Sequence, residues 1–317
     1  MKKHQKTWTA VCLAAVLGMA VLGGCGAKKP QLPVKTEEVT VRIPGMEGEV
    51  RLAYLSDLHI IAMSDQVSEA DAATVEGRIG WAAYEGISSA EQWPGWVETL
   101  NGSGAQMVLL GGDMVDFASE ENLRILQSGM EGLKKPWMYI RADHDAEPFY
   151  LSGVSKEDST SYQNRIGAQE DVFVSEFPDF VIVGWNNSTS MLTPAGLERI
   201  REAADTGKPL ILLTHVPIEA LGDPSLAYAS MEIYQGRSLI WGFGDCYYKP
   251  NDTPEGEATK ALLEMIYSPD SPFTEILCGH LHLTWDGMVS EHVHQHVFSA
   301  AFDRTMGIIT VSGEETP

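Results

Sequence analysis

Basic side chains are scarce in this sequence. Its 317 residues include 22 Lys and Arg against 44 Asp and Glu, which gives a formal net charge of −22. A surface this acidic repels polyanions over a Debye length, about 10 Å at ordinary salt, and therefore argues against a nucleic-acid polymer as the partner. A ligand that carries phosphate would need a local cation.

Cysteine is also rare, with four in the whole chain. Cys12 and Cys25 lie in the first segment, so Cys246 and Cys278 remain for the rest. One disulfide between these two is possible outside the cytoplasm. A cysteine at a strand end is more commonly a small buried apolar residue, so we expect no bridge. Their spacing gives no zinc-ribbon pattern.

The apolar run near the start of the chain falls short of the ~20 residues that cross a bilayer. It follows three lysines and ends in Leu-Gly-Gly-Cys, which resembles the lipobox of bacterial lipoproteins. The resemblance implies a signal peptide at residues 1–24, lipidation of Cys25, and an extracytoplasmic protein anchored in the cell membrane. Residues 25–36 would form a tether, and residues 37–317 the folded domain. A plain secretory signal or an uncleaved anchor are the alternatives.

Six short apolar runs have the length and composition of buried strands. They span residues 50–57, 106–113, 136–143, 180–188, 209–215 and 274–280. Helices are predicted between them where Thr193-Pro194 and Thr253-Pro254 supply an N-cap and a first helical residue. The alternation indicates an α/β fold with a mainly parallel or mixed sheet covered by helices. Residues 61–95 and 217–252 match no regular element well, and we expect long loops there.

Five of the six runs end in side chains that can bind a metal. These are Asp57 with His59, Asp113, Asp143 with His144, His215, and His280 with His282. Each one alone is compatible with an ordinary turn, cap or surface residue. Because the carboxyl ends of strands form the ligand crevice in open α/β sheets, we expect all five sets to converge there.

The motifs "DLH", "GGDMVD", "ADHD", "TH" and "GHLH" resemble, in order and spacing, the five motifs of the calcineurin-like metallophosphoesterases. The resemblance covers about residues 49–300. It implies a four-layered α/β/β/α sandwich of two mixed β-sheets. It also implies an enzyme with two divalent metal ions, either Mn, Fe or Zn, that hydrolyses small phosphate mono- or diesters by a metal-bridging hydroxide.

The resemblance assigns a role to each site residue. One ion would be held by Asp57, His59 and His282, and the second by Asp143, His215 and His280. Asp113 would bridge the two ions. His144 would act as general acid at the leaving group and Asp145 would orient it. In the same motifs, Asp116 is expected to cap or orient the following turn, and Gly111 and Gly112 to let the backbone approach the metals.

One motif departs from the family pattern, since Asp143 stands where the family has Asn. A carboxylate oxygen can replace an amide oxygen on a divalent ion. Its charge would cancel the one net positive charge of the centre and weaken attraction for a phosphate dianion. We therefore expect either tighter metal binding or a less charged substrate such as a phosphodiester. The rival hypothesis is a non-catalytic metal- or ligand-binding lipoprotein that keeps the fold.

Two further patterns stay open. The stretch "EHVHQHVF" places His292, His294 and His296 on one face of a possible strand, where they could form a third metal site, a proton relay or an exposed rim. Several aromatic residues could line a pocket for a base or an aryl group, or could pack in the core. They are Trp81, Trp93, Trp241, Phe243, Tyr247 and Tyr248.

Overall fold

The computed structural model describes residues 32–166, 170–187 and 191–313. The predicted signal peptide, Cys25 and residues 25–31 of the predicted tether lie outside these residues. The first strand, β1 (Lys35–Arg42), begins within the last two residues assigned to the tether. Among the described residues, no helix is both long enough and apolar enough to cross a membrane.

The first sheet has five strands in the order β1-β11-β2-β3-β4. It is mixed, because β11 and β2 run antiparallel while the other neighbours are parallel. Its further strands are β2 (Glu49–Leu55), β3 (Met107–Leu110), β4 (Trp137–Tyr139) and β11 (Thr305–Ser312).

The second sheet has six strands in the order β5-β6-β7-β8-β10-β9. It is mixed as well, with antiparallel pairs β5-β6 and β10-β9 at its two edges and parallel strands between them. Its strands are β5 (Val172–Glu176), β6 (Val181–Trp185), β7 (Leu210–Thr214), β8 (Phe273–Cys278), β9 (Trp285–Met288) and β10 (His294–Val297).

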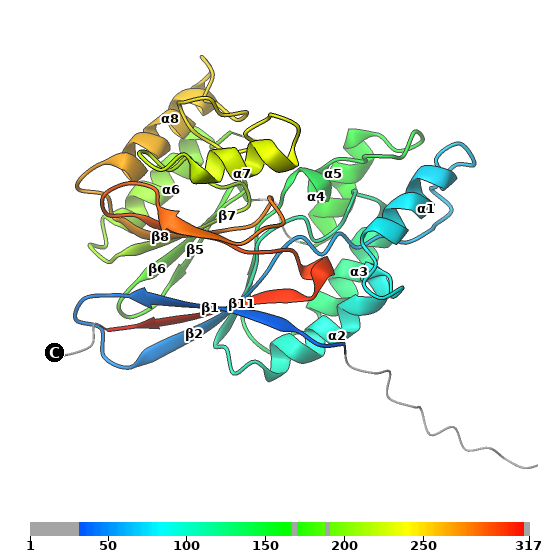
Figure 1. Cartoon of the computed structure of the whole chain (residues 1–317), viewed down its shortest axis with the longest axis horizontal. Coiled ribbons are helices and arrows are strands. Elements are labelled where there is room, and N and C mark those ends of the chain that lie inside the picture. Colours follow the sequence, from blue (N-terminus) through cyan, green and yellow to red (C-terminus); the bar gives the residue numbers. More distant parts are fainter. Residues whose placement is uncertain (1–31, 167–169, 188–190, 314–317) are drawn as a thin grey trace, which may run out of the picture. The chain divides into compact units, whose positions relative to one another are not determined.

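Side-chain alternation along the strands builds three separate apolar layers. Leu52 of β2 and Leu213 of β7 face each other's sheets in a central core, while Leu55 and Leu212 face outward. The outer face of the first sheet packs on α2 (Ser89–Gly102) and α3 (Glu120–Met130). That of the second packs on α6 (Pro194–Ala204) and α8 (Pro254–Tyr267), as Figure 1 shows.

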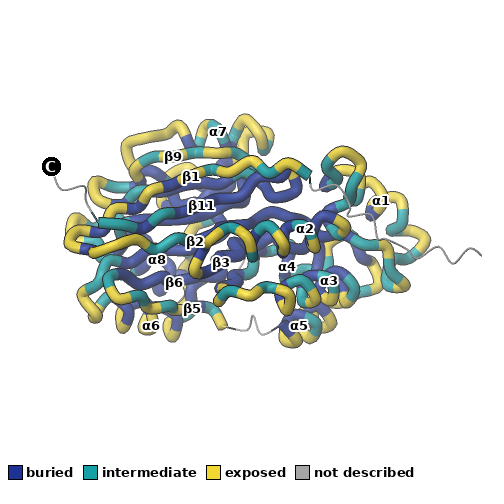
Figure 2. Tube along the Cα trace, turned by 90° about the horizontal axis from the view of Figure 1, so that it is seen from below, coloured by how far each residue is buried: buried dark blue, intermediate teal, exposed yellow. Residues whose placement is uncertain are grey.

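This is the predicted α/β/β/α sandwich of two mixed sheets, and the fold prediction is confirmed. The strands are largely buried, whereas the outer faces of the helices are exposed (Figure 2). Both predicted helix starts are also confirmed. The Thr193 hydroxyl accepts a hydrogen bond from the Gly196 N–H at 2.9 Å, and the Thr253 hydroxyl accepts one from the Gly256 N–H at 3.1 Å.

The two predicted loops were partly wrong. Residues 61–95 contain α1 (Ala72–Trp81) and the start of α2, and residues 217–252 contain α7 (Ser225–Ile233). Helix α1 was not predicted because its sequence has no strong apolar stripe, and Val75 is the one residue that it buries. Shorter elements are α4 (Asp143–Ala146), α5 (Lys156–Arg165) and the 3₁₀ turn η1 (Ala301–Asp303).

The remaining cysteines are both free and buried, in agreement with the expectation of no disulfide between Cys246 and Cys278. Cys278 is the last residue of β8 and packs in the outer core of the second sheet. Both pack as small side chains in this core, and the Cys278 thiol also donates to the His296 carbonyl at 3.3 Å.

Candidate metal centre

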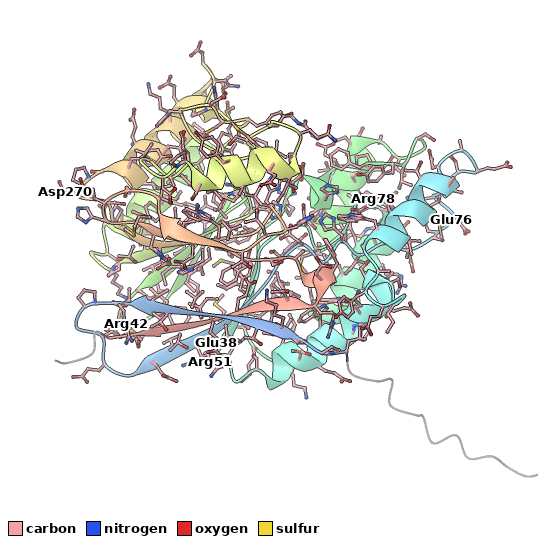
Figure 3. The ribbon with its side chains drawn as sticks, in the orientation of Figure 1. Glu38, Arg42, Arg51, Glu76, Arg78 and Asp270 are labelled. Atoms are coloured by element: carbon pink, nitrogen blue, oxygen red, sulfur yellow. The ribbon has the colours of Figure 1, made fainter. Side chains whose placement is uncertain are left out.

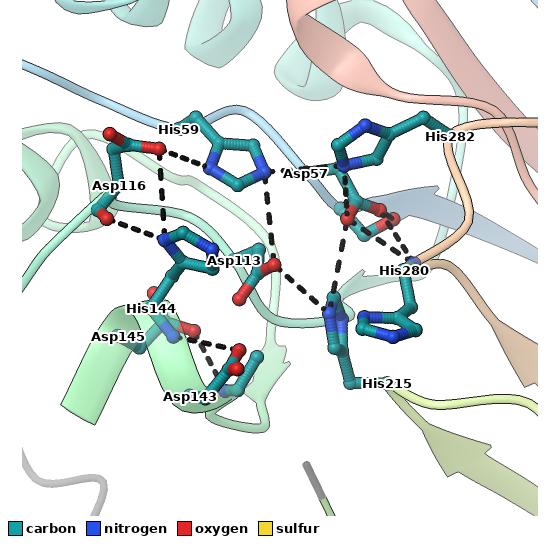
Figure 4. A network of polar contacts seen from close by, with 12 residues as sticks. Asp57, His59, Asp113, Asp116, Asp143, His144, Asp145, His215, His280 and His282 are labelled. Carbon is teal, nitrogen blue, oxygen red and sulfur yellow. Dashed lines mark hydrogen bonds and ion pairs between the residues drawn. The ribbon is translucent and has the colours of Figure 1, made fainter. Parts of the chain in front are cut away.

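The predicted ligands lie in loops that follow the carboxyl ends of strands from both sheets. Loops after β2 and β3 of the first sheet carry Asp57, His59 and Asp113. Loops after β7 and β8 of the second sheet carry His215, His280 and His282. Figure 4 shows all six side chains gathered in one network, with Asp113 between His59 and His215.

The backbone is strained at this edge. Nine non-glycine residues of the described part of the chain have a positive φ, and five of them are predicted ligands. These five are Asp57 (56°), His59 (47°), Asp113 (50°), His280 (71°) and His282 (52°). Asp and His tolerate this conformation better than most residues, but it still costs of order 1 kcal/mol each. Such strain clusters at functional sites, where the surrounding structure holds it in place.

Two glycines allow the loops to approach one another. A Cβ on Gly279 would lie 2.3 Å from Asp57 Oδ2, and Gly112 combines a φ of +93° with a Cβ position 3.0 Å from His215 Nδ1. Gly111 serves a different purpose from the one predicted, since a Cβ there would meet the Tyr54 hydroxyl at 2.3 Å. Its hydrogen side chain therefore makes room for a buried tyrosine.

Asp57, His59 and His282 form the first group of possible ligands. Their ligand atoms all lie within 4.8 Å of one another. His282 Nε2 is 3.3 Å from Asp57 Oδ1 and 3.3 Å from His59 Nε2. This composition, two imidazoles and one carboxylate, suits Zn, Fe or Mn.

Asp113, His215 and His280 form the second group within the same distance limit. Asp113 Oδ2 is 3.2 Å from His215 Nε2 and 3.7 Å from His59 Nε2 of the first group. Asp113 therefore lies between the two groups and would be in reach of an ion held by either. The two groups contain the side chains that the sequence assigned to the two ions, apart from Asp143, and their division between ions stays a prediction.

Three buried atoms in this network have no hydrogen-bond partner among the described residues: Asp113 Oδ1, His215 Nε2 and His280 Nε2. Buried polar atoms are rarely left unpaired, because each one costs about 1–3 kcal/mol. All three are atoms that coordinate divalent cations. The donor set therefore fits two metal ions.

Hydrogen bonds to the far side of two rings fix which nitrogen faces the centre. His59 Nδ1 is 2.8 Å from Asp116 Oδ1, and His215 Nδ1 donates to the Gly111 carbonyl at 2.8 Å. Each Nε2 is thereby left for a metal, as is usual for histidine ligands.

Arg78 of α1 holds Asp116 in turn. Its Nε donates to Asp116 Oδ2 at 2.9 Å and its Nη2 donates to Oδ1, so the pair is bidentate. Figure 3 shows Arg78 projecting from α1. The prediction that Asp116 caps or orients the following turn was wrong, because its carboxylate instead orients His59. Sequence reasoning also missed Arg78, which lies in a segment interpreted as a loop and belongs to no motif.

The charges of the network favour bound cations. Burial raises the pKa of Asp57, but His215 and His282 outweigh it and bring the pKa down to about 2. Burial, together with the charge of His215, lowers the pKa of His280 to about 3, so this ring is neutral. Burial also opposes protonation of His215, yet Asp113 raises its pKa to about 10. A divalent cation would take the place of that proton.

His144 stands beside the centre, in a group with His59 and Asp113. Its Nδ1 lies 2.5 Å from the carbonyl oxygen of Asp116, so Nε2 is the ring nitrogen left over. The prediction that Asp145 orients His144 was wrong. The buried Asp145 carboxylate accepts hydrogen bonds from the N–H groups of Val115 (3.1 Å) and Ala142 (2.9 Å), and so fixes the loop backbone. Burial and the charge of Asp113 raise its pKa to about 7.

Asp143 borders the centre. Among the described residues it joins none of the groups of three close ligand atoms, and its Oδ1 accepts the His144 N–H at 2.9 Å. Burial and the charge of Asp113 raise its pKa. Of the seven predicted ligands, the structure thus brings six together and places the seventh on the wall of the same cavity.

A cavity of about 330 Å³ opens over the centre. Its wall includes the cationic side chains of Arg78 and Arg237. They supply the local positive charge that a phosphate-bearing ligand would need in so acidic a protein. Five aromatic side chains also line it: Trp81, Tyr150, Tyr234, Tyr247 and Tyr248.

Three of the six predicted aromatics therefore line the cavity. The other three do not. Trp93 and Trp241 are buried in the two outer cores, and Phe243 packs on Tyr267 with ring centroids 6.0 Å apart.

Comparison with known proteins adds independent information on the chain. No curated protein matches its sequence. Among solved structures, it is similar to a dimetal phosphatase from Danio rerio, with 13% identity and a TM-score of 0.47 over 80% of this chain and 88% of that one. It is also similar to purple acid phosphatase PPD1 from yellow lupin seeds, with 11% identity and a TM-score of 0.47 over 80% of this chain and 44% of the lupin chain.

The family-level comparison covers most of the sequence and all five motifs. The pattern of the calcineurin-like phosphoesterases matches residues 50–283, the span that supplies every ligand of both groups. The chain therefore belongs to the calcineurin-like phosphoesterase family.

Proposed function

We propose that this protein hydrolyses phosphate esters with two divalent metal ions, Mn, Fe or Zn. The proposal rests on the convergence of six possible ligands from loops of both sheets. Three of them have a buried atom without a hydrogen-bond partner among the described residues. When bound, two such ions would supply Lewis acidity and positive charge to the phosphoryl group. Metal analysis combined with a phosphoester screen tests the proposal.

His144 is the proposed general acid. Its Nδ1 is held by the carbonyl of Asp116, and a carbonyl can only accept a hydrogen bond, so Nδ1 carries a proton. Burial disfavours a second proton, but the charges of Asp113 and Asp143 raise the pKa of the ring. The doubly protonated ring would present Nε2–H to the leaving-group oxygen.

The side chains of the cavity wall favour a substrate ester that carries a flat apolar group. Trp81, Tyr247 and Tyr248 offer ring faces or edges against which an aryl group or a base would pack. Arg237 would meet the charged part of the substrate at the rim, since its guanidinium is exposed and lies 5.8 Å from the Tyr247 ring.

A phosphodiester is the proposed substrate class. Asp143 and Asp113 both line the cavity, and the two carboxylates raise the cost of a further negative charge beside them. A diester carries one charge where a monoester carries two. Parallel assays with bis-p-nitrophenyl phosphate and p-nitrophenyl phosphate would show the preference, and a clear advantage for the monoester would contradict this part of the proposal.

The rival is a binding protein without turnover. It would take up two metal ions and hydrolyse no member of a broad phosphoester panel. The wild type and His144→Ala would then behave identically in every assay. Turnover that depends on His144, with metal content unchanged, decides for the enzyme.

We also propose that the protein is exported and anchored at Cys25. Support comes from the sequence of the first 25 residues alone. Labelled fatty acid should enter the wild type and be absent from Cys25→Ala, which should also leave the membrane fraction. Equal labelling of both forms would reject the anchor.

A further inference from the structure

A second cluster of imidazoles and carboxylates lies on β10 and on the two strands, β8 and β9, that flank the loop carrying His280 and His282. It consists of Glu275 on β8, Asp286 on β9, and His294 and His296 on β10. His294 is directly opposite Glu275, and His296 is directly opposite Asp286. All four side chains therefore project from the same face of the second sheet.

That face is the inner one. Leu277 has the same parity on β8 as Glu275, and Phe298 continues the parity of His296, and both belong to the core between the sheets. Glu275 is 5% exposed and His296 is 8% exposed. Two of the four ionisable groups, Glu275 and His296, are thus buried at the edge of an apolar layer, and buried charge calls for compensation.

The atoms are spaced as metal ligands would be. Glu275 Oε1 lies 3.0 Å from His294 Nδ1 and 3.2 Å from His296 Nε2. In a tetrahedral zinc site with arms of about 2.0–2.1 Å, two ligand atoms are roughly 3.3 Å apart. Both distances from Glu275 are close to this value, and the ligand atoms of all three residues lie within 4.8 Å of one another.

Asp286 contacts the opposite side of both rings. Its Oδ1 is 3.1 Å from His294 Nε2, and its Oδ2 pairs with His296 Nδ1. Each imidazole thus turns one nitrogen toward Glu275 and the other toward Asp286. A carboxylate on the outer nitrogen of a metal-binding histidine is the usual supporting arrangement, and here one carboxylate supports two rings.

One atom of the cluster lacks a partner. His296 Nε2 is buried and makes no hydrogen bond among the described residues, although Glu275 Oε1 is near it. The ring is therefore not aimed along a hydrogen bond to that oxygen. Glu275 Oε1 already has His294 Nδ1 as a hydrogen-bond partner, so an ion lying between Glu275 and His296 would supply the partner that His296 Nε2 lacks.

We propose that Glu275, His294 and His296 bind a third divalent ion, zinc, with Asp286 orienting both rings. Two neutral imidazoles and two carboxylates would balance its charge. Solvent reaches the site past His294, whose side chain is 29% exposed, so water can occupy the fourth position. This site is separate from the dinuclear centre and does not depend on the proposed hydrolysis.

Its position suggests a structural role. Glu275 precedes and Asp286 follows the loop that carries His280 and His282 into the dinuclear centre. Zinc held between β8 and β10, with Asp286 on the edge strand β9, would tie both ends of that loop. Occupancy should therefore raise the thermal stability of this edge.

Zinc content of the full chain tests the site by elemental analysis. The untagged protein, purified in detergent, is stripped of metal, reloaded with excess zinc so that the dinuclear centre also holds zinc, and dialysed. We expect about three equivalents in the wild type and about two in His296→Ala. His292→Ala is the matched control, because His292 is exposed and outside the cluster, and it should keep three. Two equivalents in all three proteins would overturn the proposal.

An Asp113→Ala background separates this site from the dinuclear centre. That variant should retain about one equivalent, and Asp113→Ala combined with Asp286→Asn or His296→Ala should bind zinc at least ~10-fold more weakly. Asp286 is largely exposed, so its substitution should leave folding intact. Added zinc should raise the melting temperature of Asp113→Ala and leave Asp113→Ala/His296→Ala unchanged. An equal response of both to zinc would show that the cluster is only a hydrogen-bonded ion-pair network.

Discussion

The two histidine clusters use similar side chains on very different backbones. The ligands of the dinuclear centre lie on loops beyond the strand ends, and five of them have a left-handed backbone. The four residues of the second cluster lie within β8, β9 and β10, and none of them has a positive φ. The dinuclear centre thus requires backbone conformations outside helices and strands. The second cluster results directly from the pairing of neighbouring strands.

This difference explains what each arrangement can do. Loops can aim side chains from distant parts of the chain at one point and leave an open face for a substrate, as the cavity over the dinuclear centre does. Paired strands fix side chains at set spacings with little freedom. The first arrangement suits catalysis and the second suits a rigid structural site.

The largest effect is expected from Asp113→Ala. Removing the carboxylate between both ligand groups should empty the dinuclear centre and lower kcat/KM by about 10⁴-fold, equivalent to the several kcal/mol that bound metals supply. Elemental analysis and steady-state kinetics measure both. His296→Ala should leave turnover within about threefold. A comparable loss of turnover in the two variants would remove the distinction between the clusters.

His144→Ala should come next. The ring contributes a proton donor and, as proposed, no metal bond, so kcat should fall by about 10²–10³-fold while metal content stays unchanged. A leaving group of low pKa needs less protonation, so p-nitrophenyl esters should lose less than alkyl esters. A variant that loses its metals instead would make His144 a ligand.

A smaller effect is expected from Asp116→Asn. Loss of the carboxylate that holds His59 Nδ1 and pairs with Arg78 should weaken binding of one ion by about 10–100-fold. Metal titration of the apoprotein should then show one weakened and one unchanged site. Arg78→Lys, which keeps the charge but loses the bidentate geometry, should fall between this variant and the wild type.

Asp143→Asn is expected to have the smallest effect. It removes one negative charge from the cavity wall and should shift the ratio of monoester to diester turnover a few-fold, about threefold to tenfold, toward the monoester. The pair of p-nitrophenyl substrates measures the ratio directly. An unchanged ratio, with unchanged metal affinity, would mean that Asp143 has no electrostatic role in the site.

Much of the fold could be read from the sequence, because buried strands leave continuous apolar runs. All six predicted runs contain strands. β1 was not predicted, because only Val39 and Val41 of its residues are buried and the other positions are polar. An edge strand of this kind is defined by its pairing with β11, far away in the sequence, and local pattern does not encode that pairing.

The convergence of these six side chains was predictable for another reason. Each of them belongs to a short sequence motif, and such a motif can be recognised without knowing how the chain packs. The supporting contacts were not predictable. Whether Asp145 or the Asp116 carbonyl meets the His144 ring depends on side-chain direction, and Arg78 reaches Asp116 from a helix with little apolar pattern. Such contacts arise only once the chain has folded.

Because each ligand group draws on loops of both sheets, neither half of the sandwich contains a complete site. Asp57 and His59 follow the first sheet and His282 the second, while Asp113 follows the first and His215 and His280 the second. Tight uptake of either ion would thus wait until the halves have docked, and metal loading would act as a built-in check on assembly. A chain whose two halves have not docked correctly would bind neither ion tightly.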